Sequence, residues 1–305
     1  MLSASRSFSV ALVALLTTVP GVASAELFRD QMNNGAAWGV NASGSDSAAT
    51  FNYDYSADGI PEAPNSVGGD DATRGVKLEA NIESGSGQFF TLYPTGQSFS
   101  GDYQLRFDAW MNWGTGGTTE FLGGGIGYND TDADLTSGAQ AITTGDGGSA
   151  NDWRALKSGF FVAAEDMTAG TRQGSEPYYA DFLPSVNGSV AGSPGFQWVT
   201  WEFDVDGSIV DVRIEKPNGD RLLIATLDGS DMSDGSSGFS TSGNLSLFYA
   251  DFFTSVAEPA GSTFGLIDNV VVRVPEPSTL ALCAIGAMGL VVAGRRRQRA
   301  AGTKR

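Results

Sequence analysis

The sequence predicts an all-β fold, an antiparallel β-sandwich over residues 26–274. Apolar and polar residues alternate with a period of two in several segments, as in half-buried strands. Glycine, asparagine and aspartate cluster between these segments and predict turns. No segment in this range has the 3.6-residue period of an amphipathic helix. Its 249 residues suit one large β domain.

The clearest strand is residues 103–113, where alternation predicts one face in the core and one face outward. The core face is Tyr103, Leu105, Phe107, Ala109, Met111 and Trp113. The outward face is Gln104, Arg106, Asp108, Trp110 and Asn112.

Residues 198–228 predict a meander of three antiparallel strands. Asp206-Gly207 favours the first hairpin turn, and Asn218-Gly219 favours a type I′ turn before the third strand. Further strands are expected at 50–54, 75–80, 88–92, 120–128, 159–163, 244–249 and 264–274, with long loops at 131–151 and 168–195.

The N-terminal residues predict a secretory signal peptide over 1–25. Arg6 supplies a basic start, and an apolar run from Phe8 to Val19 forms the expected signal helix. Ala23-Ser24-Ala25 provides small residues suited to cleavage before Glu26. The body of the protein is therefore expected to be exported.

The C-terminal residues predict a membrane-associated tail. Pro275, Glu276 and Pro277 end the body, because proline cannot continue a β ladder. The apolar residues 279–294 predict a single transmembrane helix, about 24 Å long and therefore short for a bilayer. A basic cluster follows and should stay in the cytoplasm: Arg295, Arg296, Arg297 and Arg299.

These three parts, in this order, resemble the PEP-CTERM sorting signal of Gram-negative bacteria. The resemblance divides the C-terminus into a sorting tail at 275–299 and a basic cytoplasmic end at 300–305. It implies an exosortase-type processing enzyme as a partner. It also implies transient anchoring in the inner membrane, then delivery to the cell surface or extracellular matrix. A plain C-terminal anchor is the alternative.

Composition excludes several functions. The chain has no histidine, which excludes Ser-His-Asp and Cys-His catalysis and histidine-ligated zinc or iron. Its one cysteine, Cys283, lies in the tail, so the body has no disulfide. Residues 26–274 contain 34 acidic and 11 basic residues, a net charge near −23. Such a body should repel nucleic acid and anionic membranes.

The body resembles jelly-roll sandwiches of concanavalin-like and carbohydrate-binding modules. The resemblance rests on residues 27–30, 103–113, 198–214 and 267–270, and it implies an extracellular polysaccharide as ligand. Trp110 is the candidate platform, because aromatic rings stack on the apolar faces of sugars. Arg106, Asp108 and Asn112 flank it as candidate partners for sugar hydroxyls. The alternative is that a loop covers Trp110.

The same resemblance implies one candidate metal site and no other cofactor. In many jelly-roll modules an acid of the first strand and an acid of the last strand meet at a structural calcium. Asp30 and Asp268 occupy those places here. The alternative is that these acids cap loop amides.

Glu202, Asp204 and Asp206 alternate on one predicted strand face and suggest a second function class. Laminarinase-like hydrolases of concanavalin-like fold carry Glu-x-Asp-x-x-Glu, but Gly207 stands at the last position here. We therefore expect no catalysis. The expected function is structural or adhesive, with polysaccharide as candidate ligand. A glycoside hydrolase or lyase of concanavalin-like fold is the alternative.

Overall fold

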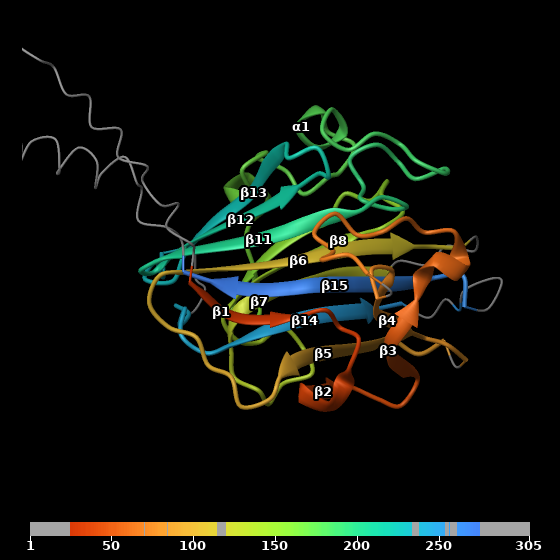
Figure 1. Cartoon of the computed structure of the whole chain (residues 1–305). Helices are drawn as coiled ribbons and strands as arrows, with labels where there is room; N and C mark the ends of the chain where they lie inside the picture. Colours follow the sequence, from red (N-terminus) through yellow and green to blue (C-terminus); the bar gives the residue numbers. More distant parts are fainter. Residues whose placement is uncertain are drawn as a thin grey trace, which may run out of the picture. The chain divides into compact units, whose positions relative to one another are not determined.

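The computed structural model describes residues 25–69, 71–83, 85–114, 120–233, 238–253, 256 and 261–274. They belong to one compact unit, Ala25–Pro275. Nearly all regular structure in them is strand, arranged as two antiparallel sheets that pack face to face (Figure 1). The prediction of an all-β antiparallel sandwich is confirmed.

The first sheet has eight strands and includes β6, whose outward face carries the predicted site residues. Its order is β13 (Arg221–Asp228), β12 (Ile209–Glu215), β11 (Val199–Asp206), β6 (Tyr103–Asn112), β15 (Phe264–Arg273), β4 (Arg74–Ala80) and β3 (Ser47–Asp54). The remaining strand, β1 (Glu26–Asp30), pairs with β15. The first and last strands of the body are therefore neighbours.

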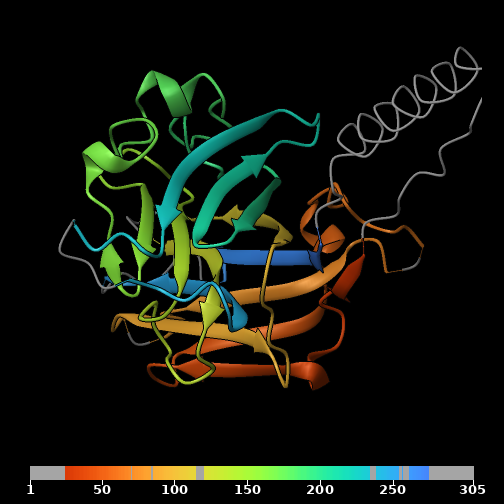
Figure 2. The same ribbon diagram turned by 90° about the vertical axis from the view of Figure 1, so that its left-hand side faces the viewer.

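The second sheet has seven strands. Its order is β10 (Phe160–Phe161), β9 (Trp153–Lys157), β8 (Ala139–Thr144), β7 (Glu120–Tyr128), β14 (Asn244–Asp251), β5 (Gln88–Pro94) and β2 (Trp38–Ala42). Figure 2 shows its green strands beside the teal meander, where β9 contacts β13. The described helices are short: η1 (Gly35–Ala37), η2 (Tyr55–Asp58), η3 (Ala164–Asp166) and α1 (Pro177–Ala180).

The core lies between the sheets and follows the period-two pattern of β6. Phe107 stacks on Trp201 of β11, with 6.4 Å between ring centroids. Both rings are fully buried, and burial of a side chain this large contributes roughly 1.5–3 kcal/mol. Gly124 of β7 makes room opposite, because a Cβ there would lie 3.1 Å from the Phe107 ring. A glycine run inside a strand thus serves close packing of the two sheets.

The meander matches the prediction, and both of its turn glycines adopt the left-handed backbone that the sequence required. Gly207 has φ of 61° and Gly219 has φ of 88°. The predicted loop at 131–151 is wrong, because it contains β8. Every residue of β8 is buried, so the strand lacks the alternation that reveals a half-buried one. The strand expected at 159–163 is only the two-residue β10.

The predicted signal helix within 1–25 and the predicted transmembrane helix at 279–294 fall outside the described residues. Among the residues that the structure does describe, the helices lack the length and apolarity that a membrane span needs.

Candidate functional site

The outward face of β6 and its two neighbours carries the predicted site residues. Paired residues of antiparallel strands point to the same face. Asp108 pairs with Thr200 on one side and Asp268 on the other, which places all three in one row. Two residues along β6, the next cross-strand row on this face places Arg106 between Glu202 and Val271.

This face has two halves. The covered half consists of the outward side chains of residues 108–112 on β6 and 264–268 on β15, which lie beneath residues 53–66. The open half consists of the outward side chains of residues 104–106 on β6 and 271–273 on β15, with those of β11 and β12 beside them.

Trp110 lies in the covered half and is only 8% exposed. Its ring packs against Trp198, with 5.7 Å between centroids, and Trp198 donates a hydrogen bond of 2.7 Å to the Pro61 carbonyl. Tyr55, Ile60 and Ala63 complete this apolar cluster. The prediction that Trp110 is a platform open to sugar is therefore wrong, because a loop covers the ring.

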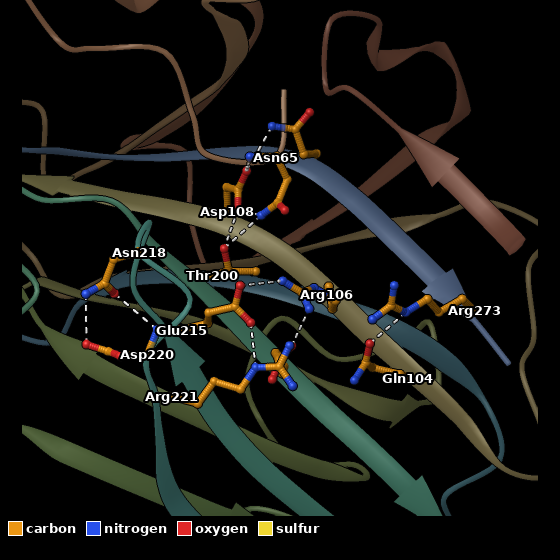
Figure 3. Close-up of polar contacts among 12 residues, drawn as sticks. Asn65, Gln104, Arg106, Asp108, Thr200, Glu215, Asn218, Asp220, Arg221 and Arg273 are labelled. Carbon is orange, nitrogen blue, oxygen red and sulfur yellow. Dashed lines mark hydrogen bonds and ion pairs between the residues drawn. The ribbon is translucent and has the colours of Figure 1, made fainter. Parts of the chain in front are cut away.

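Asp108 is fully buried and holds the covering loop onto the sheet (Figure 3). Its carboxylate accepts hydrogen bonds from the backbone and side-chain nitrogens of Asn65, at 3.0 and 2.6 Å. It also accepts one from Thr200 Oγ1 at 2.6 Å and one from Asn269 Nδ2 at 2.9 Å. Burial raises the pKa of Asp108, while these bonds favour its charged form.

The predicted sugar contacts of Asp108 and Asn112 are therefore not available in this structure. The carboxylate of Asp108 accepts hydrogen bonds from groups of the protein itself. Asn112 donates a hydrogen bond of 2.8 Å to the Ser262 carbonyl and is half-buried. Both residues hold the covered half together.

Asp268 is also buried, with 2% of its surface exposed. It accepts hydrogen bonds from Tyr55 Oη at 2.9 Å and from the Asn269 backbone nitrogen at 2.7 Å. Burial raises its pKa to about 7, and the negative charges of Asp108 and Asp30 add to the shift. Asp30 lies on the neighbouring strand β1, where it pairs with Val270.

The structure does not complete a metal site around this pair. Asp30 accepts a hydrogen bond of 2.6 Å from the Met32 backbone nitrogen. Within the described residues, no group of three or more His, Cys, Asp or Glu side chains is placed to hold a metal ion. Calcium at Asp30 and Asp268 stays a prediction.

The open half is a network of ion pairs. Arg106 contacts Glu202 at 2.5 Å and Glu215 at 3.2 Å (Figure 3). Arg221 contacts the same two acids, at 3.4 and 2.6 Å. Glu202 is fully buried, and burial raises its pKa while Arg106 and Arg221 oppose that shift. The Glu202 carboxylate is thus shielded from solvent and contacts two arginines.

The network ends at a cleft of about 310 Å³. Its lining residues are Arg29, Asn65, Val67, Arg106, Asn269, Val271 and Arg273. We call this the binding cleft. Val271 lies in register with Arg29 of β1 on one side and Arg106 of β6 on the other. Adjacent strands are about 4.8 Å apart, so the two arginine backbones lie roughly 10 Å apart across a valine floor.

The arginines of the binding cleft are held differently. Arg29 forms a rim ion pair with Glu26 at 2.7 Å. Arg273 donates from Nε to Gln104 Oε1 at 2.8 Å. Among the described residues, its two terminal nitrogens have no hydrogen-bond or ion-pair partner. Figure 3 shows Arg106 between the Asp108 group and the Arg273–Gln104 pair.

Sequence reasoning found only Arg106 among the cleft residues. Alternation on β15 could have placed Arg273 on the outward face, because it alternates with the core residues Val270 and Val272. The loop residues Asn65 and Val67 carry no periodic signal. Asn269 sits at a β-bulge with φ of 53°, which strand alternation does not predict.

A second exposed feature lies on the other sheet. Phe160, Phe161, Phe252 and Phe253 are each between 39% and 53% exposed. Arg154 lies over the Phe161 ring at 5.3 Å from its centroid. Phe161 and Phe252 line one pocket there, and we refer to the four exposed phenylalanines together as the phenylalanine patch. The sequence did not predict it.

Comparison with known proteins identifies one motif. Residues 273–297 match the PEP-CTERM protein-sorting motif. The chain carries a PEP-CTERM sorting signal. The predicted signal is confirmed, and the match includes Arg295, Arg296 and Arg297 of the basic cluster, while Arg299 lies just beyond it. Such a signal indicates export with passage through the membrane. The fold of these tail residues lies outside the described part of the chain.

No curated protein matches the sequence. Among solved structures, the VIP36 exoplasmic/lumenal domain bound to Ca²⁺ and Man3GlcNAc has a TM-score of 0.40 and 8% identity, covering 79% of this chain and 85% of that one. The carbohydrate-binding module CBM66 from Bacillus subtilis has 0.35 and 13%, covering 65% and 86%. Protein SO2946 of unknown function from Shewanella oneidensis MR-1 has 0.44 and 8%, covering 81% and 85%. Similarities this low do not identify a ligand.

Proposed function

We propose that this protein is a non-catalytic β-sandwich of the cell surface or extracellular matrix that binds polysaccharide through the binding cleft. Its role is structural or adhesive. The PEP-CTERM motif supports the route, because it indicates export. The observation that carries the ligand is the binding cleft itself, a concave site on paired strands of the body.

The chemistry of the cleft suits a sugar chain. A pyranose presents hydroxyl groups at its edge and C–H groups on its faces, so it needs both polar and apolar partners. Arg106 and Arg273 supply several N–H donors each. Val67 and Val271 supply apolar contact on the floor and rim. Site residues on strands are held more precisely than site residues on loops.

The arrangement of acids supports binding without hydrolysis. A glycoside hydrolase needs two carboxyl groups that flank the scissile bond. Here Glu202 is enclosed by Arg106 and Arg221. Asp204 is paired with Arg213 at 2.6 Å. Purified protein should therefore leave laminarin and xylan unhydrolysed, and turnover that Glu202→Gln abolishes would establish the hydrolase alternative instead.

Binding itself is tested by affinity electrophoresis of the purified protein in gels containing single polysaccharides. Retardation by at least one polymer, reduced in Arg273→Gln, is the expected result. Arg74→Gln is the matched control, because Arg74 is a partly exposed arginine of the same sheet outside the cleft, at 3.7 Å from Asp54. Equal retardation of both variants and the parent would remove the cleft from the proposal.

We also propose that an exosortase-type enzyme processes the tail after passage through the inner membrane. Intact-mass spectrometry of the surface form tests this step. A mass that ends near Pro275–Pro277 is expected. A surface form that still carries Arg305 would contradict processing.

A structural calcium between Asp30 and Asp268 is the remaining proposal. Its support is the buried carboxylate of Asp268, whose pKa is raised first by burial and then by the negative charges of Asp108 and Asp30, since a bound cation would favour the charged form. Calcium prefers oxygen ligands such as these carboxylates.

A further inference from the structure

We propose that the binding cleft recognises an anionic polysaccharide, with uronic acid carboxylates as the charged groups that Arg29, Arg106 and Arg273 bind. This inference rests on the proposed function and names the class of its ligand. Nothing in the sorting motif or in the similar structures bears on the charge of the ligand.

Basic residues are scarce in the body and are concentrated in the binding cleft. The body has only 11 basic residues against 34 acidic ones. Three of these 11 line one cleft, and none of the described residues that line it is acidic. A body this acidic would repel a polyanion over most of its surface. The binding cleft gathers three arginines in one concave place where a negatively charged sugar can meet them.

The positive charge of Arg273 in the cleft has no acidic hydrogen-bond or ion-pair partner among the described residues. Within the described residues, the side chain of Arg273 makes one hydrogen bond, to the neutral side chain of Gln104, and no ion pair. Burial lowers the pKa of Arg273, the positive charges of Arg106 and Arg221 lower it further, and the carboxylates of Glu202 and Asp204 oppose this shift. A carboxylate bound beside Arg273 would relieve that repulsion. Guanidinium groups bind carboxylates through two parallel N–H···O bonds.

The arginines of the cleft surround an apolar floor formed by Val271. Arg29 and Arg106 flank Val271 in one cross-strand row, and Arg273 lies two residues further along β15 on the same face. A uronic acid can place its C–H face on the valine floor while its carboxylate reaches the arginines. A neutral sugar would leave Arg273 without a charged partner. The cleft therefore fits a charged sugar better than a neutral one.

Asp108 has a positioning role in this account. It accepts hydrogen bonds from the amide nitrogens of Asn65 and Asn269, and both asparagines line the binding cleft. The buried carboxylate thereby fixes one wall of the cleft through the covered half. An adjacent wall fixed in advance reduces the entropy lost when a ligand binds.

The experiment compares polygalacturonate with the same polymer after chemical reduction of its carboxyl groups to alcohols. Affinities of the purified protein, Arg273→Gln, Arg273→Lys and the control Arg74→Gln are measured by calorimetry at one ionic strength. We expect the parent to bind polygalacturonate at least tenfold more tightly than the reduced polymer. Arg273→Gln should lose at least tenfold, Arg273→Lys should recover part of that loss, and Arg74→Gln should match the parent.

The outcomes separate the inference from the proposed function. Equal binding of the two polymers, reduced by Arg273→Gln, would overturn the anionic ligand and leave polysaccharide binding in place. Binding of neither polymer, with none bound from a wider polysaccharide panel, would overturn both. A preference for polygalacturonate that Arg273→Gln and Arg74→Gln reduce equally would show general charge attraction and also overturn the inference.

Discussion

The covered half and the open half lie on the same face of the same two strands, yet the first is buried beneath a loop and the second borders a cleft. In the covered half, Trp110 and Asp108 are buried beneath residues 53–66. In the open half, Arg106 and Arg273 reach a cleft. Strand alternation therefore determines which face of the sheet a side chain lies on, whereas the loop above that face determines whether the side chain is exposed to solvent. The halves should therefore respond differently to mutation.

The largest effect is expected from Trp110→Ala in the covered half. Removing a buried tryptophan leaves a cavity beside Trp198, and such a change costs about 3–5 kcal/mol in the free energy of unfolding. Trp110→Phe should cost less, because it keeps an aromatic ring in the cluster. Urea denaturation of both variants measures the loss. A Trp110→Ala loss below about 1 kcal/mol would mean that the ring is not buried as described.

The second prediction concerns pH and Asp268. Its folded pKa of about 7 lies above the ordinary value of 3.8, so the folded state holds this proton more tightly than the unfolded chain. Its contribution to stability is full below about pH 4 and is lost as pH rises to about 7. Three pKa units correspond to on the order of 4 kcal/mol. Asp268→Asn should flatten the stability profile over this window, and an unchanged profile would contradict the shift.

Calcium gives the third effect and tests the proposed site at Asp30 and Asp268. A ligand that binds only the folded state at a hundredfold excess over its Kd adds about 2.7 kcal/mol, or roughly 5–10 °C in Tm for a domain this size. Magnesium should do less, because it loses its water reluctantly. Melts in chelator, calcium, magnesium and sodium chloride measure these shifts. Equal shifts from all salts, or a calcium shift that persists in Asp268→Ala, would exclude the site.

The smallest effect on stability is expected in the open half. Arg273→Gln removes a charge that makes one hydrogen bond to Gln104 and no ion pair within the described residues, so the free energy of unfolding should change by less than about 1 kcal/mol. The same variant is expected to lose polymer binding. Parallel urea denaturation provides this control. A loss comparable to that of Trp110→Ala would place Arg273 in the structural part of the face.

Much of the fold could be predicted from the sequence, because half-buried strands such as β6 show their period directly. The turns at Gly207 and Gly219 were predictable from a different local signal, the Asp-Gly and Asn-Gly pairs that favour hairpin turns. Strand β8 was not, because a strand buried on both faces has no alternation. The sorting tail was predictable from Pro275–Pro277 and the arginines that follow.

The candidate site was only partly predictable. Alternation placed Arg106, Asp108, Trp110 and Asn112 on one face, and pairing confirms that face for all four. It could not show that the chain near Asn65 crosses the face and buries half of it. Such coverage depends on long-range contacts, here the hydrogen bonds between Asn65 and Asp108. The binding cleft arises at the edge of that coverage.

Hydrogen exchange in the presence of oligogalacturonides tests most directly the claim that the open half is the binding surface. Added ligand should slow exchange in residues 65–69 and 269–273, at the two walls of the binding cleft, in the parent protein and in Arg74→Gln. Arg273→Gln should lose this protection while its exchange without ligand stays unchanged. Protection confined to residues 160–161 and 252–253, at the phenylalanine patch, would contradict the account and move the binding surface to the opposite sheet.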